Sequence, residues 1–293
     1  MRCILLAFLC LFSGVVLASQ QSYQQEIIDW QSKRQKSIKN PKGWLSLTGL
    51  FWLHEGVNSF GSAGDNEIQL PKGRDYAGNI ILKKNGIIEA HILPGSEITV
   101  DGKVVSKVAL LTDQEQNTSH IQSGSVDFYL IQRGEKIAAR VKDFNRVATL
   151  DLEPLSFYPI NINWKIKATY HPYPKGTQVH IPTVIDTTFT PEHVGKITFQ
   201  VHGKQYSLDA IDDGKYLFVI FKDKTSQTKS YGAGRFLYAP KPSAKDTTFW
   251  LDFNKAYNPP CAFSSYATCP LPPPQNQLEL AIHAGEQRYQ HYD

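Results

Sequence analysis

One stretch near the C-terminus, DFNKAYNPPCAFSSYATCPLPPP at 252–274, restricts the folds open to this chain more than any other. It is rich in proline, which donates no backbone hydrogen bond and fixes φ, so neither a helix nor a sheet ladder can run through it. Its polar side chains Asp252, Asn254 and Asn258 must therefore bond to the local backbone or be displayed for another purpose. We expect a long irregular loop here.

Most of the remaining chain alternates short apolar runs with turn dipeptides, a pattern typical of paired antiparallel strands. The turn signals are Asn85-Gly86, Asp101-Gly102, Arg133-Gly134 and His202-Gly203. The predicted fold class is therefore mainly β, with antiparallel sheets forming a sandwich or barrel-like core, an N-terminal helix and a proline-rich C-terminal loop.

Three segments complete this expected fold. Residues 20–38 carry apolar side chains at spacings of three and four, which predicts a helix with one apolar stripe. The segment at 43–53, GWLSLTGLFWL, predicts a buried strand or a bent strand pair, with Trp44 and Trp52 in the core. A final strand is expected in QLELAIHAG, at 277–285.

The chain shows no internal repeat, low-complexity tract or flexible linker. A single β-rich domain over residues 19–293 is the economical interpretation. The alternative is two packed subdomains divided near 170–176, YHPYPKG, where Pro172 and Pro174 interrupt a strand.

The first 18 residues have the pattern of a secretory signal peptide: Arg2, an apolar run from Ile4 to Val16, and small residues ending at Ala18. We expect cleavage after Ala18 and a periplasmic or secreted protein. The apolar run is short for a membrane span, so no transmembrane segment is expected once the leader has been removed.

Cys3 and Cys10 leave with such a leader, and Cys261 and Cys269 remain. An oxidising compartment favours a disulfide between them, worth about 2 to 3 kcal/mol for so short a loop. The alternatives are a reactive thiol and half of a metal site. The spacings typical of zinc ligands are missing from the sequence, so no metal is expected.

The formal net charge is +4, and acidic and basic residues are interspersed, which argues against a nucleic-acid or membrane surface. The sequence contains no P-loop and no G-x-S-x-G, and the glycines of SYGAGRF do not follow a nucleotide-binding pattern. No cofactor is therefore predicted, and a small-molecule ligand is the expected kind of partner.

Several blocks of the chain resemble a bacterial and archaeal family catalogued as domain of unknown function 1684. They are GWLSLTGLFWL from 43, RVKD from 140, FVIFKDKT from 218, SYGAGRFL from 230, DFNKAYNPPC from 252 and ATCPLPP from 267. The resemblance implies no activity, cofactor or catalytic residue. Members without a leader share the cysteine pair, which keeps a thiol or packing role for Cys261 and Cys269 open.

Three polar clusters lie where apolar strands give way to loops: Arg140 with Asp143; Asp223 and Thr225 with Tyr231 and Arg235; and Asp252 with Asn254, Tyr257 and Asn258. If they converge, they would offer arginines for an anion, carboxylates for proton transfer and amides for orientation. Glu286, after the expected final strand, could add a carboxylate. The structural alternatives are a local ion pair in the first cluster and Asx or ST turns in the others.

The leading hypothesis is a polar pocket at strand ends that binds or hydrolyses a small anionic or hydroxylated ligand. Asp252 or Asp223 would act as base, and Arg235 and Arg140 would hold the anion. The rival hypothesis is a non-catalytic envelope binding or scaffold protein, with Phe263 and Tyr266 facing a partner. A thiol redox protein is the third reading, although C-x-x-C would suit it better.

Overall fold

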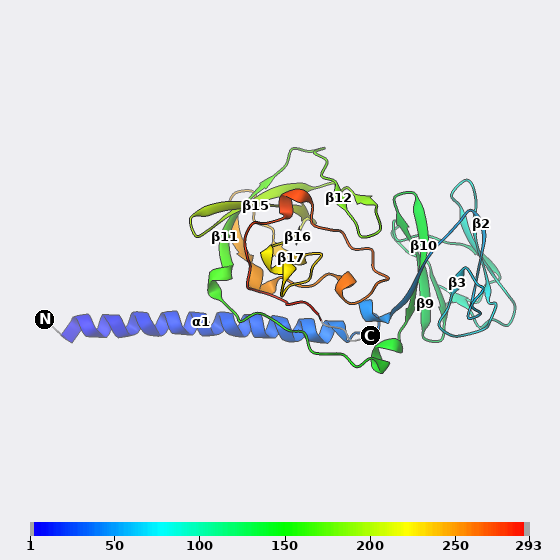
Figure 1. Cartoon of the computed structure of the whole chain (residues 1–293), viewed down its shortest axis with the longest axis horizontal. Coiled ribbons are helices and arrows are strands. Elements are labelled where there is room, and N and C mark those ends of the chain that lie inside the picture. The colour runs from blue at the N-terminus through cyan, green and yellow to red at the C-terminus, as the bar shows by residue number, and fades with distance from the viewer. Residues whose placement is uncertain (1–2, 290–293) are drawn as a thin grey trace. The chain divides into compact units, whose positions relative to one another are not determined.

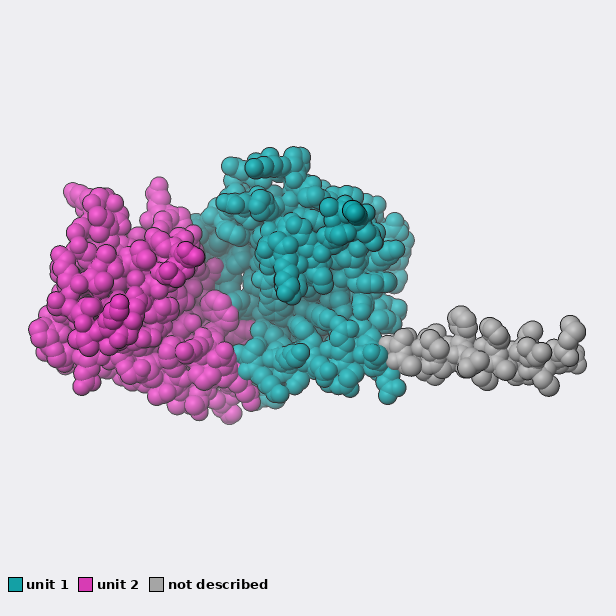
Figure 2. Space-filling model, turned by 180° about the vertical axis from the view of Figure 1, so that it is seen from behind, with its two compact units in different colours: residues 1–37, 153–262, 269–293 teal, residues 38–152, 263–268 magenta. Residues whose placement is uncertain are grey.

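The computed structural model describes residues 3–289, and the chain divides into two compact units (Figure 2). Unit 1 comprises residues 1–37, 153–262 and 269–293, and unit 2 comprises residues 38–152 and 263–268. The chain thus leaves unit 2 at 152/153. The segment at 170–176, where a division was expected, lies inside unit 1 at the end of a strand.

Unit 2 contains two five-stranded sheets. The first has the order β1 (Leu47–Trp52), β10 (Lys136–Asp143), β9 (Val126–Arg133), β8 (His120–Ser123) and β6 (Thr99–Val100). The second has the order β3 (Ile68–Gln69), β2 (Gly56–Gly61), β4 (Gly78–Leu82), β5 (Ile88–Ile92) and β7 (Lys107–Ala109). The strands pair antiparallel, apart from the short parallel pair of β2 with β3.

The core of unit 2 is built from the inward residues of both sheets, among them Phe60, Ile80, Phe128 and Leu130. Alternation of inward apolar and outward polar residues holds the strand register, because a one-residue slip would turn the apolar set toward water. The hairpins expected at Asn85-Gly86 and Arg133-Gly134 join β4 to β5 and β9 to β10. Asp101-Gly102 is spanned by a single bridge, Val100 to Lys103.

Unit 1 is built on one six-stranded antiparallel sheet that curls into a nearly closed barrel. Its order is β17 (Arg235–Pro240), β16 (Tyr216–Phe221), β15 (Lys204–Asp212), β14 (Val194–Val201), β11 (Lys165–Pro172) and β18 (Thr248–Asp252). β16 and β17 lie side by side in Figure 1. The small pair β12 (Ile181–Pro182) and β13 (Thr188–Phe189) stands apart from this sheet. The mainly β prediction is confirmed.

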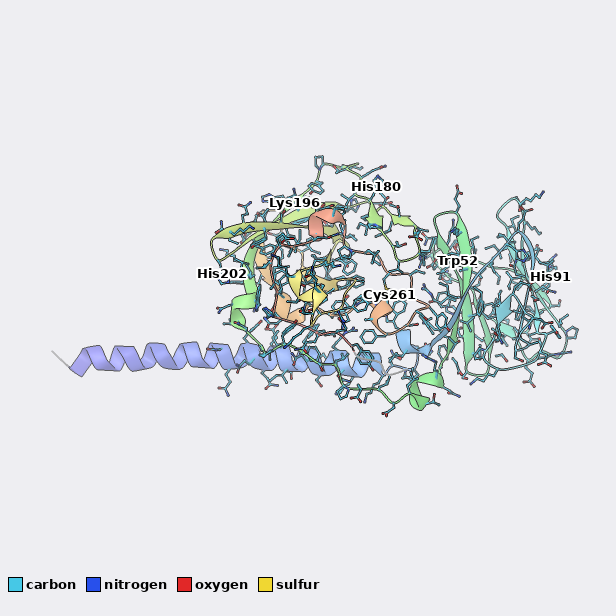
Figure 3. The ribbon with its side chains drawn as sticks, viewed as in Figure 1. Trp52, His91, His180, Lys196, His202 and Cys261 are labelled. Atoms are coloured by element: carbon cyan, nitrogen blue, oxygen red, sulfur yellow. A yellow bond between two sulfur atoms is a disulfide. The ribbon has the colours of Figure 1, made fainter. Side chains whose placement is uncertain are left out.

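The hairpin between β14 and β15 turns at His202-Gly203, as expected, and His202 is labelled there in Figure 3. Both residues have positive φ, 49° and 76°, which is the backbone that a two-residue hairpin turn requires. Inside the sheet, Phe199, Phe221, Phe253 and Leu217 pack into one core. The barrel therefore encloses side chains rather than a channel.

Single-turn 3-10 helices connect the strands. They are η1 (Trp44–Ser46), η2 (Arg146–Thr149), η3 (Ile162–Trp164), η4 (Lys224–Gln227), η5 (Phe253–Lys255), η6 (Pro260–Ala262) and η7 (Pro274–Asn276). Two of them, η5 and η6, fall in the proline-rich stretch and η7 begins at its last residue, Pro274; the stretch carries no strand beyond Asp252. The expectation of an irregular loop is confirmed.

The N-terminal helix, α1 (Cys3–Ile38), includes the predicted segment 20–38. Tyr23 and Ile27 are buried, as the apolar stripe requires. Within residues 3–289, no helix combines the length and the hydropathy that a membrane span requires. The side chains of residues 1–19, which include the expected leader and its cleavage site, lie outside the described part of the structure.

A strand does form within 43–53, as β1, but two expectations are wrong: the core position of Trp44 and Trp52, and the final strand at 277–285. Trp44 and Trp52 are 43% and 39% exposed, because they lie at the ends of the η1–β1 segment and face cations instead of the core. Trp52 is labelled in Figure 3. Residues 277–285 form no strand, although Leu278, Ile282 and Ala284 do alternate into the core of unit 1.

A carboxylate of unit 2, Asp127, is buried beneath a half-exposed histidine. His120 Nδ1 lies 3.0 Å from Asp127 Oδ1. The hydrogen bond with Asp127 raises the pKa of His120 above its ordinary value, although burial opposes the shift. The protonated pair therefore stabilises the folded state.

This pair predicts how stability depends on pH. A histidine whose folded pKa is raised stabilises fully below its unfolded pKa of about 6.5, and that stability is lost as the pH rises through the folded pKa. In urea unfolding followed from about pH 5.5 to 8.5, His120→Gln and Asp127→Asn should both remove this part of the pH dependence. His171→Gln, on β11, is the control and should keep it. Wild-type pH dependence in His120→Gln would contradict the assignment.

Candidate functional site

Asp223 and Arg235 form an ion pair at the centre of unit 1, with both side chains fully buried. Arg235 Nη2 donates to Asp223 Oδ1 at 3.1 Å and to the carbonyl of Ile282 at 3.1 Å. Arg235 Nη1 donates to the carbonyls of Ala284 and Glu286. Asp223 Oδ2 accepts the backbone N–H of Ile282 at 2.8 Å. The pair thus supplies the hydrogen bonds that a neighbouring strand would otherwise give to residues 282–286.

These side-chain hydrogen bonds, in place of a partner strand, explain why no strand forms where the sequence predicts the final one. The segment is extended and its apolar residues alternate. Leu278 and Leu280 bond to the backbone of Lys222 and Lys224, but from Ile282 to Ala284 the side chains of Arg235 and Asp223 take the place of a strand partner. Gly285, with φ of 79°, lets the backbone approach Ala256 more closely than any side chain would allow. Burial lowers the pKa of the Arg235 guanidinium and Asp223 opposes that shift. Both side chains are buried and neither lines the polar pocket of unit 1, so their roles as anion holder and base stay predictions.

Asp252 anchors the N-terminal helix. Its carboxylate accepts the Tyr23 hydroxyl at 2.9 and 3.0 Å and the backbone N–H of Asn254 at 3.1 Å. The Asn254 amide donates to Tyr23 and to the carbonyl of Asn161. Burial, followed by the charge of Asp252, raises the pKa of Tyr23. The structure therefore places Asp252 and Asn254 in a buried network that fastens α1 and caps η5.

Glu286 and Asn258 form a second buried anchor for α1. Glu286 accepts Arg34 Nε at 2.6 Å and the backbone N–H of Asn258 at 2.8 Å. Asn258 Nδ2 donates to the carbonyl of Gln287 at 2.7 Å. Burial raises the pKa of Glu286, and the charge of Arg34 opposes the shift. The Asn258–Pro259 bond is trans. The anchor fixes the backbone immediately before residues 287–289.

Tyr231, the last predicted ligand residue of unit 1, bonds to the proline-rich loop. Its hydroxyl donates to the carbonyl of Cys261 at 3.0 Å. The Cα atoms of Cys261 and Cys269 are 6.1 Å apart, within the range that disulfides span, and their sulfur atoms lie within bonding distance. Cys261 is labelled in Figure 3. The pair is thus placed to form the predicted disulfide.

Arg140 and Asp143 belong to unit 2, at the end of β10. Arg140 is nearly buried, donates to Thr268 Oγ1 at 2.9 Å, and leaves its buried Nε without a partner in the described chain. Asp143 pairs with Lys72 at 2.8 Å and accepts Ser125 Oγ. Burial would raise the pKa of Asp143, but these two hydrogen bonds hold it below its ordinary value. Convergence of this cluster with those of unit 1 stays a prediction.

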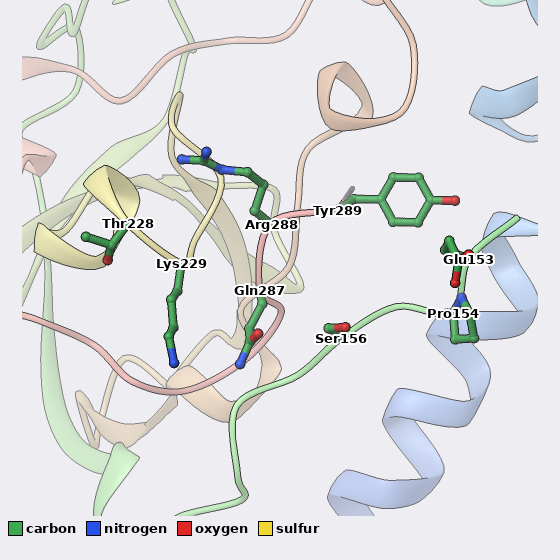
Figure 4. A pocket seen from close by; sticks show the side chains of 8 residues that line it. All are labelled: Glu153, Pro154, Ser156, Thr228, Lys229, Gln287, Arg288 and Tyr289. Atoms are coloured by element: carbon green, nitrogen blue, oxygen red, sulfur yellow. The ribbon is translucent and has the colours of Figure 1, made fainter. Parts of the chain in front are cut away.

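Unit 1 has a polar pocket of about 510 Å³ beside these anchors (Figure 4). It is lined by Glu153, Pro154, Ser156, Thr228, Lys229, Gln287, Arg288 and Tyr289. Two backbone bonds assemble it: Gln287 N–H donates to the carbonyl of Ser156 at 2.8 Å, and Arg288 N–H donates to the carbonyl of Lys229 at 2.7 Å. The C-terminal segment is therefore held between two loops.

The charge of this pocket is carried by two cations and one carboxylate. Lys229 has no ion-pair partner among residues 3–289, and in Figure 4 its side chain runs in the same direction as that of Gln287. Arg288 points away from them and its guanidinium bonds to the carbonyls of Ser230 and Ser226 at 3.4 Å. Lys229 and Gln287 therefore lie along the pocket, where Gln287 Nε2 donates to the carbonyl of Phe157 at 3.4 Å, whereas Arg288 supports the loop that carries Lys229.

Sequence reasoning missed this pocket. The predicted residue Glu286 is next to Gln287 in the chain but lies behind the pocket, tied to Arg34. Lys229 stands in a polar run, KTSQTKS, that looks like an ordinary solvated turn. In residues 3–289, no group of three metal-ligating side chains that could hold an ion is found.

A model of the family described as "Protein of unknown function (DUF1684)" matches residues 151–287. The similar blocks from residue 218 onward lie inside this range, and those at 43–53 and 140–143 lie outside it. No curated protein matches the chain significantly.

Two solved structures were compared. An uncharacterized protein of Haloarcula marismortui, solved by NMR, is 34% identical over 47% of this chain and 77% of its own, with a TM-score of 0.39. Rad53 residues 1–466 in complex with AMP-PNP is 12% identical over 62% of this chain and 38% of its own, with a TM-score of 0.15. At these TM-scores neither superposition supports a structural argument.

The buried pair predicts a structural effect for the residues first expected to bind a ligand. Arg235→Ala leaves Asp223 charged and unpaired in the core and frees three carbonyls, so unfolding should become easier by about 3 to 5 kcal/mol in urea titrations. Lys224→Ala, which breaks an exposed ion pair with Glu279, is the control and should cost about 0 to 1 kcal/mol. Equal stability of the two variants would contradict the structural role.

Proposed function

Since the chain belongs to the DUF1684 family, whose description names no activity, we propose a function from the site itself: unit 1 binds a small anionic ligand in the pocket of Lys229 and Gln287. One observation carries the proposal. Lys229 points along the pocket without a carboxylate partner in the described chain, beside the Ser156 hydroxyl and the Gln287 amide, which keeps a second N–H besides the one it donates to the carbonyl of Phe157 at 3.4 Å.

The size and chemistry of the pocket fit this class of ligand. A volume of about 510 Å³ lies within the range of small-molecule sites. Hydrogen bonds from an ammonium to a phosphate or carboxylate are stronger than neutral ones, and the Ser156 hydroxyl can add a further donor. The Thr228 hydroxyl donates instead to the carbonyl of Thr225 at 3.3 Å. Glu153, at the edge of the lining, adds the only carboxylate among the eight residues.

The proposal is binding without a chemical step. Asp223 and Asp252, the bases expected for hydrolysis, are buried in hydrogen-bond networks and do not line this pocket. The rival scaffold hypothesis placed Phe263 on a partner-facing surface, but Phe263 is buried.

Export remains a proposal. The described contacts that fasten α1 begin at Tyr23, so a chain that starts at Ser19 keeps every one of them. The cysteine pair at 261 and 269 would then meet an oxidising compartment. A periplasmic or secreted protein with one disulfide is the form we propose.

The pocket predicts a charge-dependent affinity. Calorimetric titration of the purified protein with inorganic phosphate, pyrophosphate and citrate should detect binding of at least one anion. Lys229→Ala should weaken it about 10- to 100-fold, because a hydrogen bond to a charged group is worth about 1.5 to 3 kcal/mol. Lys224→Ala, in the neighbouring η4 turn, is the matched control and should bind like the wild type. Unchanged affinity in Lys229→Ala would refute the site.

Export predicts a defined N-terminus and no free thiol. Mass spectrometry of protein recovered from the periplasm or medium should show a chain beginning at Ser19. Thiol titration in denaturant should find no reactive cysteine until a reductant is added. Protein that keeps its first 18 residues, or shows two thiols when freshly purified, would count against export and against the disulfide respectively.

A further inference from the structure

The outward face of the barrel sheet carries two polar rows across neighbouring strands. Residues paired directly opposite on antiparallel strands share one face. The first row runs through the pairs of Thr248 with Thr169, Thr169 with Thr198, and Thr198 with Ser207. It crosses β18, β11, β14 and β15 and is about 14 Å long at the usual strand spacing.

The second row contains an exposed tryptophan. Trp250 of β18 pairs with Lys167 of β11, and Gln200 of β14 pairs with Gln205 of β15. Trp250 is 56% exposed and makes no ring or cation contact within residues 3–289. The intervening residues Ala168, Phe199 and Leu251 turn inward to the core. The indole ring is therefore held at the surface by the strand register, with no packing role on that side.

This face is hollowed. A depression of about 410 Å³ is lined by Lys167, Thr169, Thr198, Gln200, Gln205 and Thr248, together with two apolar residues. The side chains of Thr169, Thr198, Gln200 and Gln205 make no hydrogen bond to the described part of the chain, and only Thr248 is engaged, with Asp246. None of the lining residues is acidic, and Lys167 is the single charge.

We propose that this depression binds a neutral oligosaccharide. A sugar ring has an apolar C–H face and a rim of hydroxyls that both donate and accept. Trp250 offers a flat apolar surface for the former. Threonine hydroxyls and glutamine amides offer both donors and acceptors for the latter. A row of four strands can hold more than one sugar ring, so a chain fits the face better than a monosaccharide does.

The site is independent of the anion pocket, because the two share no lining residue and differ in chemistry. The anion pocket has loop-borne cations and buried backbone anchors. The sheet face has one cation and unpaired neutral groups on rigid strands. Any solvated sheet face carries polar residues. The exposed Trp250 beside the depression distinguishes this face, and it is therefore the residue to substitute.

The test uses the purified protein with maltohexaose, cellohexaose and chitohexaose, followed by tryptophan fluorescence and calorimetry. At least one hexasaccharide should bind, Trp250→Ala should weaken it at least tenfold, and Gln200→Ala should weaken it by a smaller factor. Trp52→Ala, an exposed tryptophan of unit 2, is the matched control and should bind like the wild type. Both Trp250 and Gln200 are exposed, so the variants should fold normally.

Two outcomes would overturn the proposal: no binding of any of the three sugars up to millimolar concentration, or binding that Trp250→Ala leaves unchanged. Phosphate binding in the same samples reports the anion pocket separately. Phosphate binding without sugar binding would therefore count against the sugar site alone, and sugar binding without phosphate binding would count against the anion pocket alone.

Discussion

Unit 1 depends on the buried pair of Arg235 and Asp223. A lone ion in a protein core is costly, and removal of one partner leaves the other uncompensated. Here the charges also satisfy backbone groups: three carbonyls and one N–H of residues 282–286 bond to the pair. The C-terminal segment can consequently lie extended against the barrel core without belonging to its sheet.

The remaining anchors of unit 1 follow from the position of that segment. Glu286 accepts hydrogen bonds from Arg34 of α1 and from the backbone N–H of Asn258. Asp252 accepts the hydroxyl of Tyr23, which lies nearer the N-terminal end of the same helix. The next residues, Gln287 and Arg288, then bond to the loops at Ser156 and Lys229. A pocket assembled from three distant segments is thus held in place by side chains that never reach it. Most of the polar residues that stood out in the sequence are these supports.

The sequence was sufficient for the fold class and for much of its detail, because strand alternation and turn dipeptides are local signals. The hairpins at Asn85-Gly86, Arg133-Gly134 and His202-Gly203 and the irregular proline stretch are examples. The apolar alternation at 277–285 misled, since packing is periodic there but the ladder stops. Beyond Leu280 the hydrogen bonds come from the side chains of Arg235 and Asp223, which lie far from the segment in sequence. Lys229 left no signal, because an unpaired lysine in a loop can be recognised only after its surroundings are known.

The central claim is that these buried anchors present Lys229 and Gln287 to an anion. A crystal structure of the protein grown with saturating inorganic phosphate tests it most directly. The account predicts a phosphate whose oxygens contact Lys229 Nζ and the Gln287 amide, with Arg235 and Glu286 in their buried contacts. A pocket without phosphate under those conditions, or phosphate bound only elsewhere on unit 1, would contradict it.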